Sequence, residues 1–237
     1  MLVPRLSKMA LKYPGTTMTL LANLVVIMSA HFGESCLAWM RSLPDDYMTS
    51  KQTVSYVGLF DDVAAEAWYA PAVDYVKYGR LMYGTGSNLF QPDAQMTRAM
   101  LAQVLYELEG APSVKGLSCP FTDVGGSWYT DAVIWAYNAG VVAGVSATQF
   151  APNEALTREQ MVTMLFGYAG REETLSGSDG ALAGYQDQAS VSDWAREAMA
   201  WAVSSGVISG TSATTLSPQK VGTRAEVATV LMQFCEQ

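Results

Sequence analysis

Three copies of a short motif place an arginine where a helix is predicted to begin. They are Thr97-Arg98-Ala99-Met100, Thr157-Arg158-Glu159-Gln160 and Thr223-Arg224-Ala225-Glu226. Apolar residues follow each copy at positions i, i+3 and i+4, which marks one buried face of a helix. Threonine is a good N-cap, so the arginine falls at the first helical position, where the macrodipole makes a cation cost about 0.3–1 kcal/mol. Three such arginines in register indicate a role other than helix stability.

A guanidinium beside the unpaired N–H groups of a helix start is suited to binding a carboxylate or a phosphate. We therefore predict anion sites at Arg98, Arg158 and Arg224. The alternative is that each arginine forms a salt bridge with a neighbouring repeat. The helix caps beside these sites are predicted to be Thr97, Thr157 and Thr223. Gln160 and Glu226 can complete a capping box, whereas Met100 cannot.

A tryptophan also recurs at one place in each copy, at Trp68, Trp128 and Trp194. An aromatic residue follows seven positions later each time, and a spacing of seven puts two residues on one helical face. This pattern predicts that the tryptophans belong to the core, with a platform for ligands as the alternative.

The motifs are parts of a longer repeat, because the tryptophans and the arginines keep the same offsets of 60 and 66 residues. Each copy contains a predicted helix, a glycine turn, an aromatic or leucine residue two positions before a proline, and a second helix. Gly140 and Gly206 are predicted to end the first helix in the left-handed conformation. Arg80 stands there in the first copy, so its helix end is expected to differ by a residue. The predicted units are residues 58–110, 118–170 and 183–237, and each is too small to fold alone.

The N-terminal region differs from the repeats. Three basic residues precede an uncharged apolar run at residues 18–30, which is short for a membrane span and typical of a signal peptide. We predict a signal peptide over residues 1–38 and a spacer over residues 39–57; a retained anchor is the alternative. The remaining chain has 11 basic and 21 acidic residues, a surface that disfavours nucleic acid and anionic membranes. Cleavage of the signal peptide would also remove His31, the one histidine of the sequence. Histidine-based triads and most zinc or copper sites are then excluded.

The repeats resemble S-layer homology (SLH) domains in their aromatic-Asp-Val opening, their tryptophan, their Gly-hydrophobic-hydrophobic-x-Gly turn, their Phe-x-Pro segment and their Thr-Arg-Ala-Glu motif. The resemblance runs from about Gly58 to the C-terminus and includes three copies. It implies an all-α fold in which the three repeats form a pseudo-threefold, three-pronged helical bundle, and a monomer. Cys119 and Cys235 would then lie a third of a turn apart, too far for a disulfide.

The resemblance also implies a function, namely non-covalent attachment to the bacterial cell wall of a secreted protein. The partner would be a secondary cell-wall polysaccharide, often pyruvylated, whose acidic group meets the motif arginine in grooves between repeats. The tryptophans would border those grooves. Only the third copy has the full Thr-Arg-Ala-Glu tetrad, so the three grooves need not bind equally.

Two other classes of function are weighed against this one. A scaffold that binds acidic protein segments could use the same grooves. An enzyme is not expected, because the chain has neither a nucleophile-elbow nor a phosphate-loop pattern. Acidic residues recur once per repeat at Asp62, Asp123 and Asp187, as structural caps do, whereas a glycosidase needs a unique carboxylate pair. No cofactor and no metal is expected.

Overall fold

The structure is a computed structural model that describes residues 59–171, 177 and 179–236. The predicted signal peptide (1–38) and spacer (39–57) lie outside these residues. In the described residues the regular structure is helical, with a few isolated β-bridges and no strand. None of the described helices has both the length and the apolar character needed to cross a membrane.

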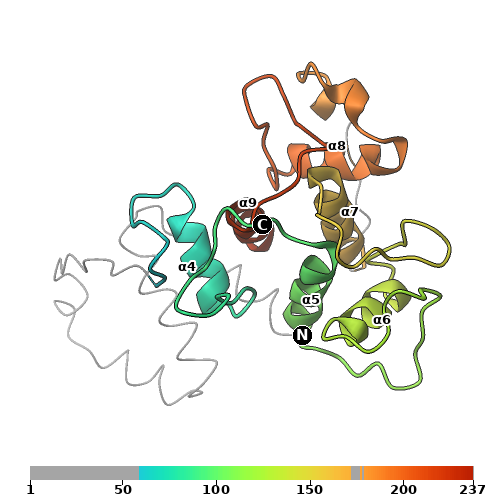
Figure 1. Cartoon of the computed structure of the whole chain (residues 1–237). Helices are drawn as coiled ribbons and strands as arrows, with labels where there is room; N and C mark the ends of the chain where they lie inside the picture. Colours follow the sequence, from blue (N-terminus) through green and yellow to red (C-terminus); the bar gives the residue numbers. More distant parts are fainter. Residues whose placement is uncertain (1–58, 172–176, 178, 237) are drawn as a thin grey trace, which may run out of the picture. The chain divides into compact units, whose positions relative to one another are not determined.

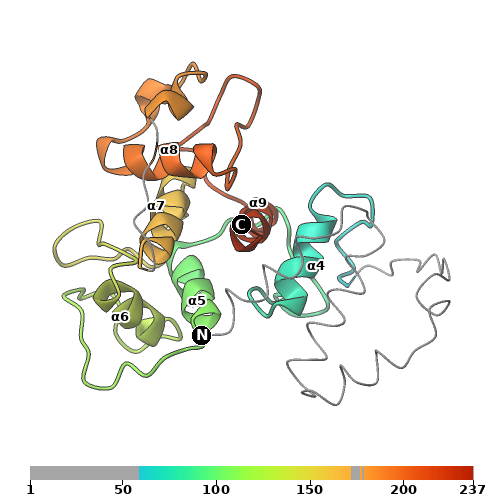
Figure 2. The same ribbon diagram turned by 180° about the vertical axis from the view of Figure 1, so that it is seen from behind.

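Each repeat contributes an outer and an inner α-helix to the compact unit Gly58–Phe234. The outer helices are α4 (Ala70–Tyr78), α6 (Thr130–Asn138) and α8 (Arg196–Ser204); the inner helices are α5 (Arg98–Leu108), α7 (Arg158–Ala169) and α9 (Arg224–Cys235). Short 3-10 turns, η2 (Asp179–Leu182), η3 (Gln188–Ser190) and η4 (Asp193–Ala195), precede α8. Figures 1 and 2 show α5, α7 and α9 close together, with the outer helices around them. The predicted all-α, three-repeat fold is confirmed.

The inner helices bury the apolar faces that their sequence spacing predicts. Leu101, Leu105, Leu165, Val227 and Leu231 are each 0% exposed. Two of the inner helices pack against the outer helix of the following repeat: α5 contacts α6 and α7 contacts α8. The core is therefore built across repeats, and no repeat completes its own.

All three outer helices end in the same way. Gly140 and Gly206 have the predicted left-handed φ, at 73° and 79°, and Arg80 adopts a φ of 58° at the equivalent place. The amide of each donates to the carbonyl three residues earlier, at 3.1–3.2 Å, as a Schellman-type helix end requires. The expected one-residue difference in the first repeat is wrong, because Arg80 adopts the left-handed conformation that glycine adopts more easily and makes the same local hydrogen bond.

The aromatic or leucine residue two positions before the proline is buried next to an adjacent repeat. Phe90, Phe150 and Leu216 are all 0% exposed, as expected for plugs. The rings of Phe90 and Phe150, however, lie against the arginine of an adjacent repeat, 4.5 Å from Arg224 and 4.6 Å from Arg98. We call these contact regions joints: joint 1–2 is the start of α5 against residues 150–154, joint 2–3 is the start of α7 against residues 216–220, and joint 3–1 is the start of α9 against residues 90–94.

A ring of three backbone hydrogen bonds links the repeats next to the inner-helix caps. Met96 N–H donates to Gly222 O at 3.1 Å, Gly222 N–H to Leu156 O at 2.9 Å, and Leu156 N–H to Met96 O at 2.8 Å. Each residue directly precedes the threonine cap of its repeat, and all three are buried. The ring closes without a free end, so joint 3–1 completes the same arrangement as the two joints before it.

Candidate functional site

The predicted threonine caps are present at the start of the inner helices. The hydroxyls of Thr97, Thr157 and Thr223 each accept a hydrogen bond from the amide three residues later, at 3.3 Å. Gln160 and Glu226 return a bond to the backbone N–H of their threonine, both at 3.1 Å. The second and third repeats therefore have the predicted capping box and the first does not.

The other amides of these helix starts are not free, which corrects a premise of the predicted anion site. Arg98 N–H donates to Glu154 O at 3.1 Å, and Ala99 N–H donates to Pro152 O at 3.0 Å. The equivalent pairs are Arg158 with Lys220, Glu159 with Pro218, Arg224 with Ala94 and Ala225 with Pro92. Because the next repeat already satisfies these donors, a bound anion cannot use them.

The three arginines link adjacent repeats. Nε of Arg98 donates to Phe150 O at 2.8 Å and its Nη2 donates to Ala143 O at 3.1 Å. Arg158 makes the same pair of bonds to Leu216 and Ser209, and Arg224 makes them to Phe90 and Tyr83. Each side chain is 6–8% exposed. Each arginine thus contacts a neighbouring repeat, as the alternative interpretation predicted. The acceptors, however, are backbone carbonyls and not the carboxylates of a salt bridge.

Nη1 of each guanidinium makes no hydrogen bond to an oxygen or nitrogen atom of the described residues. Arg98 and Arg158 make no hydrogen bond through Nη1 within the described part of the chain, and Nη1 of Arg224 contacts only the sulfur of Met96 there, at 4.0 Å. Among the described side chains, Gln103 alone has a polar atom that is both fully buried and unpartnered, so Nη1 of Arg98 and Arg158 keeps contact with solvent. Burial lowers the pKa of Arg98, while Glu154 and Asp123 offset part of this effect. The guanidinium stays charged at neutral pH.

An aspartate in each repeat holds the segment that carries these carbonyls. The two carboxylate oxygens of Asp123 accept the amides of Phe150 and Ala151, at 2.9 and 2.8 Å. Asp62 and Asp187 bind the equivalent amides of their own repeats. Burial raises the pKa of Asp123, but the hydrogen bonds from these amides and the charge of Arg98 together lower it by more. The pKa therefore lies below its ordinary value. The recurring aspartates are structural caps, as the sequence predicts.

The tryptophans lie at the surface, so the prediction that they belong to the core is wrong. Trp68 is 65% exposed, Trp128 62% and Trp194 58%. Trp68 and Trp128 pack edge-on against the tyrosine that follows them. The helical spacing gave a wrong prediction because α4 and α6 begin two residues after Trp68 and Trp128. These tryptophans therefore precede the helix and do not lie on its buried face. The aromatic residues seven positions later do lie inward, since Trp135 and Trp201 are each 6% exposed.

Each arginine reaches into the repeat that carries the next tryptophan. The Arg98 side chain contacts the second repeat, which carries Trp128, and the Arg224 side chain contacts the first repeat, which carries Trp68. No cation–π contact joins these arginines to these tryptophans in the described residues. The structure thus brings the caps and arginines together at each joint, and places the tryptophans just before the outer helices of the repeats that the arginines contact.

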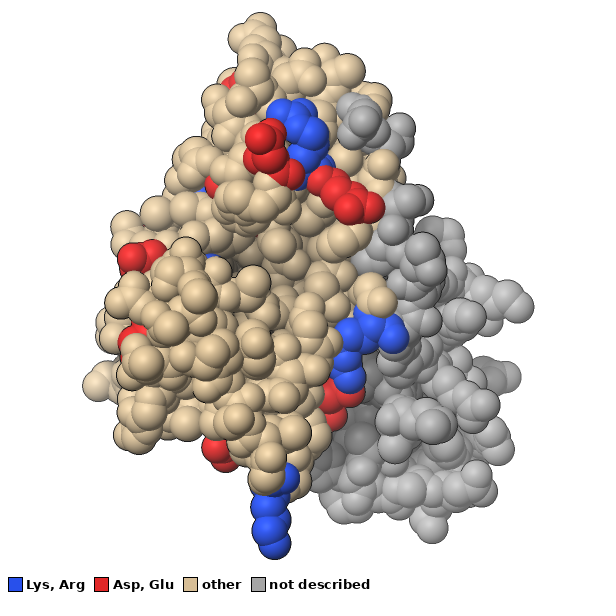
Figure 3. All heavy atoms as spheres, turned by 90° about the vertical axis from the view of Figure 1, so that its right-hand side faces the viewer, with Lys and Arg blue, Asp and Glu red and all other residues tan. Residues whose placement is uncertain are grey.

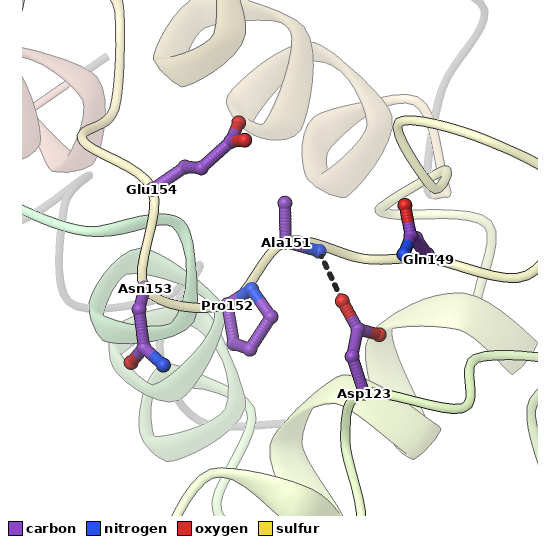
Figure 4. A pocket seen from close by; sticks show the side chains of 6 residues that line it. All are labelled: Asp123, Gln149, Ala151, Pro152, Asn153 and Glu154. Carbon is purple, nitrogen blue, oxygen red and sulfur yellow. Dashed lines mark hydrogen bonds between the residues drawn. The ribbon is translucent and has the colours of Figure 1, made fainter.

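An open hollow of about 460 Å³ lies beside joint 1–2. It is lined by Asp123, Gln149, Ala151, Pro152, Asn153 and Glu154. Figure 4 shows Asp123 pointing at the backbone of Ala151, while Asn153 and Glu154 extend away from it in different directions. On the face in Figure 3, the coloured charges are scattered, with acidic and basic groups side by side and no broad basic patch. An anion would therefore meet local arginine contacts and not a general positive field.

The sequence profile of the S-layer homology domain matches this chain three times, over residues 59–100, 120–162 and 184–228. These matches contain both halves of every joint. The chain belongs to the S-layer homology family. Its membership and its S-layer relatives identify a secreted protein of the cell surface and cell wall.

Curated relatives share the repeats within much longer proteins. The chain is 26% identical over 178 residues to an S-layer protein of Bacillus thuringiensis subsp. finitimus, a match that covers 75% of the chain and 21% of the relative. It is 32% identical over 163 residues to the surface-layer 125 kDa protein of Lysinibacillus sphaericus, covering 66% and 13%. It is 27% identical over 186 residues to the exoglucanase XynX of Acetivibrio thermocellus, covering 75% and 16%.

The chain thus spans about a fifth or less of the length of these S-layer homology proteins. The likeness to the exoglucanase is confined to its S-layer homology region and does not extend to a catalytic domain. What the relatives have in common with this chain is a non-catalytic domain for attachment at the cell surface.

Proposed function

We propose that this chain attaches non-covalently to the bacterial cell wall by binding an anionic secondary cell-wall polysaccharide at its joints. The acidic group of the polymer, such as the carboxylate of a pyruvyl ketal, binds the outward Nη1 edge of Arg98, Arg158 or Arg224. A charge-assisted hydrogen bond of this kind contributes roughly 1.5–3 kcal/mol. A sugar ring stacks on Trp68, Trp128 or Trp194. The protein acts as a monomer whose three repeats supply the joints.

The observation that carries this proposal is the exposure of an equivalent tryptophan in all three repeats. Each ring is more than half exposed, although tryptophan is highly buried on average. These rings therefore contribute little to the core, and an exposed indole is suited to contact with a ligand. Among the described aromatic rings, Trp68 and Trp128 each contact only that of the adjacent tyrosine, which leaves a broad face open to a ligand.

The test is sedimentation of the protein with purified wall polysaccharide that has been stripped of protein. We expect binding to native polysaccharide and at least a tenfold loss after mild acid removes ketal-linked carboxylates. Binding to a protein extract of the wall, without binding to the polysaccharide, would favour the scaffold for acidic segments instead. Equal binding to polysaccharide before and after acid treatment would contradict the role of the carboxylate.

A further inference from the structure

We propose that joint 2–3 is closed by the chain's own carboxylate, Glu159, so that the anionic polymer binds at joints 1–2 and 3–1. This inference rests on the proposed function, because it states which of the three equivalent joints remain open. It makes Glu159 a residue that determines where on the molecule the ligand binds.

Glu159 is the second residue of α7 and is 2% exposed. Its Oε2 accepts the amide of Ser192 at 3.0 Å, and its Oε1 accepts the Ser192 hydroxyl at 2.9 Å. Oε1 also accepts a hydrogen bond from Nε2 of Gln219 at 2.7 Å. All of these donors belong to the third repeat, so the carboxylate crosses the joint and is fully partnered there.

The partners of this carboxylate belong to two segments of the third repeat, both of which border the proposed site at joint 2–3. Ser192 lies two residues before Trp194, at the start of the outer helix of the third repeat. Gln219 lies in the segment whose carbonyls hold Arg158 and the first amides of α7. Glu159 therefore ties the start of α7 to the region that bears Trp194, and it occupies donors of Ser192 and Gln219 that could otherwise support a bound carboxylate beside Arg158.

Within the described residues, the other two joints have no such connection. The residues equivalent to Glu159 are Ala99 and Ala225, whose methyl groups cannot bridge to the next repeat. Opposite Ala99 stand Gly126 and Asn153 in place of Ser192 and Gln219, and the hollow in Figure 4 lies beside Asn153. Opposite Ala225 stand the exposed residues Glu66 and Asp93, which point to a weaker site at joint 3–1 than at joint 1–2.

An external anion cannot easily displace Glu159. Its departure would leave a carboxylate without partners in a site that excludes water, and an unpaired buried charge is strongly unfavourable. If Glu159 stayed in place, the joint would hold two carboxylates, and like charges that share a site repel each other. Joint 2–3 is therefore a structural connection, although its arginine and tryptophan match those of the other joints.

The experiment counts binding sites by isothermal titration calorimetry with a methyl hexoside that carries a 4,6-pyruvyl ketal. We expect two sites in the unaltered protein. Trp194→Ala should leave the number of sites and their affinities unchanged within twofold, whereas Trp68→Ala and Trp128→Ala should each remove one site. Three sites in the unaltered protein, or loss of a site in Trp194→Ala, would overturn the closed joint.

Glu159→Ala gives the second repeat the residue of the other two, so the protein should still fold. We expect it to gain a third site that Trp194→Ala then removes. Hydrogen exchange of the Ser192 amide tests, without any ligand, whether Glu159 closes joint 2–3. That exchange should be at least tenfold slower than the exchange of Gly126 and should become fast in Glu159→Ala. If the unaltered protein takes up no probe, the proposed function fails, while equal exchange at Ser192 and Gly126 would overturn the closed joint by itself.

Discussion

At the scale of single residues, the outer-helix regions of the second and third repeats each contain one exposed and one buried tryptophan. Trp128 is 62% exposed, whereas Trp135, seven positions later, is 6% exposed and contacts the rings of Tyr106 and Tyr168. Trp128→Ala should change the free energy of unfolding by less than about 1 kcal/mol. Trp135→Ala should lower it by about 3–5 kcal/mol, because it removes a buried indole. Urea denaturation of both variants measures the difference.

Affinity should follow the opposite order in these two variants. Trp128→Ala should weaken binding to wall polysaccharide about tenfold, as loss of roughly 1.4 kcal/mol of contact energy would. Trp135→Ala should keep its affinity under conditions where it remains folded. A large loss of stability in Trp128→Ala would place its ring in the core after all and remove the basis for its role in binding.

Asp123 should make stability depend on acid pH. Its folded-state pKa is held below the ordinary value by the amides of Phe150 and Ala151, against the effect of burial. A depressed pKa stabilises the fold fully above the unfolded value of about 3.9, and this contribution is lost as the pH falls through the lower folded value. Asp123→Asn should therefore be less stable than the unaltered protein at pH 7, and the gap should narrow below pH 4.

The matched control is Asp93→Asn, because Asp93 is exposed and accepts no hydrogen bond in the described residues. Its stability should follow that of the unaltered protein from pH 7 to pH 3 in thermal denaturation. If Asp123→Asn also follows the unaltered protein across this range, the carboxylate does not hold the segment of residues 150–154.

At the scale of elements, the three outer helices provide an internal comparison of helix ends. Arg80 adopts a left-handed φ of 58° where the other repeats have glycine. A left-handed conformation costs a residue with a side chain roughly 1–2 kcal/mol relative to glycine. Arg80→Gly should therefore raise the free energy of unfolding by about 0.5–1 kcal/mol, after the greater chain entropy of glycine is deducted. Gly140→Ala is the reciprocal variant and should lower the free energy of unfolding by about 1 kcal/mol.

Chemical denaturation measures both variants. A destabilised Arg80→Gly would mean that contacts of the arginine side chain outweigh the strain of its backbone.

The sequence predicted the features that depend on neighbouring residues. The threonine caps, the capping boxes of Gln160 and Glu226, and the left-handed glycines all follow from local backbone geometry. The family resemblance supplied the arrangement of the three repeats. Periodicity failed at Trp128 because it assumed a helix that begins two residues later. Occupation of the helix-start amides was missed because their acceptors, such as Pro152 O, lie more than 50 residues away in the sequence. The connection made by Glu159 was missed for the same reason, although its difference from Ala99 and Ala225 was visible.

At the scale of the whole molecule, Arg224 closes the circle of repeats by joining α9 to the first repeat. Its Nε and Nη2 donate to Phe90 O at 2.7 Å and Tyr83 O at 2.6 Å. Arg224→Ala should lower the free energy of unfolding by about 1.5–3 kcal/mol, because it leaves these carbonyls without their charged donor. Arg224→Lys should recover only part of this loss, since an ammonium group cannot reproduce the planar fork.

Arg196 is a control for the helix-dipole effect alone. It also stands at the first position of a helix, α8, but donates no hydrogen bond in the described residues. Arg196→Ala should leave stability unchanged or slightly higher, because a cation is unfavourable there. Thermal unfolding of both variants separates the two effects. Equal behaviour of Arg224→Ala and Arg196→Ala would show that the bonds across joint 3–1 contribute little.

Joint 3–1 has the same backbone bonds as the other two joints, yet no linker runs directly from α9 to the first repeat. Covalent connection is therefore not what orients one repeat against the next. The segment of residues 110–117 instead keeps the first repeat at a high effective concentration near the second. If the backbone were cut between Gly116 and Leu117, both pieces would keep their contact groups, including Arg98 on one side and Phe150 on the other. We therefore expect the two pieces to reassemble through these non-covalent contacts.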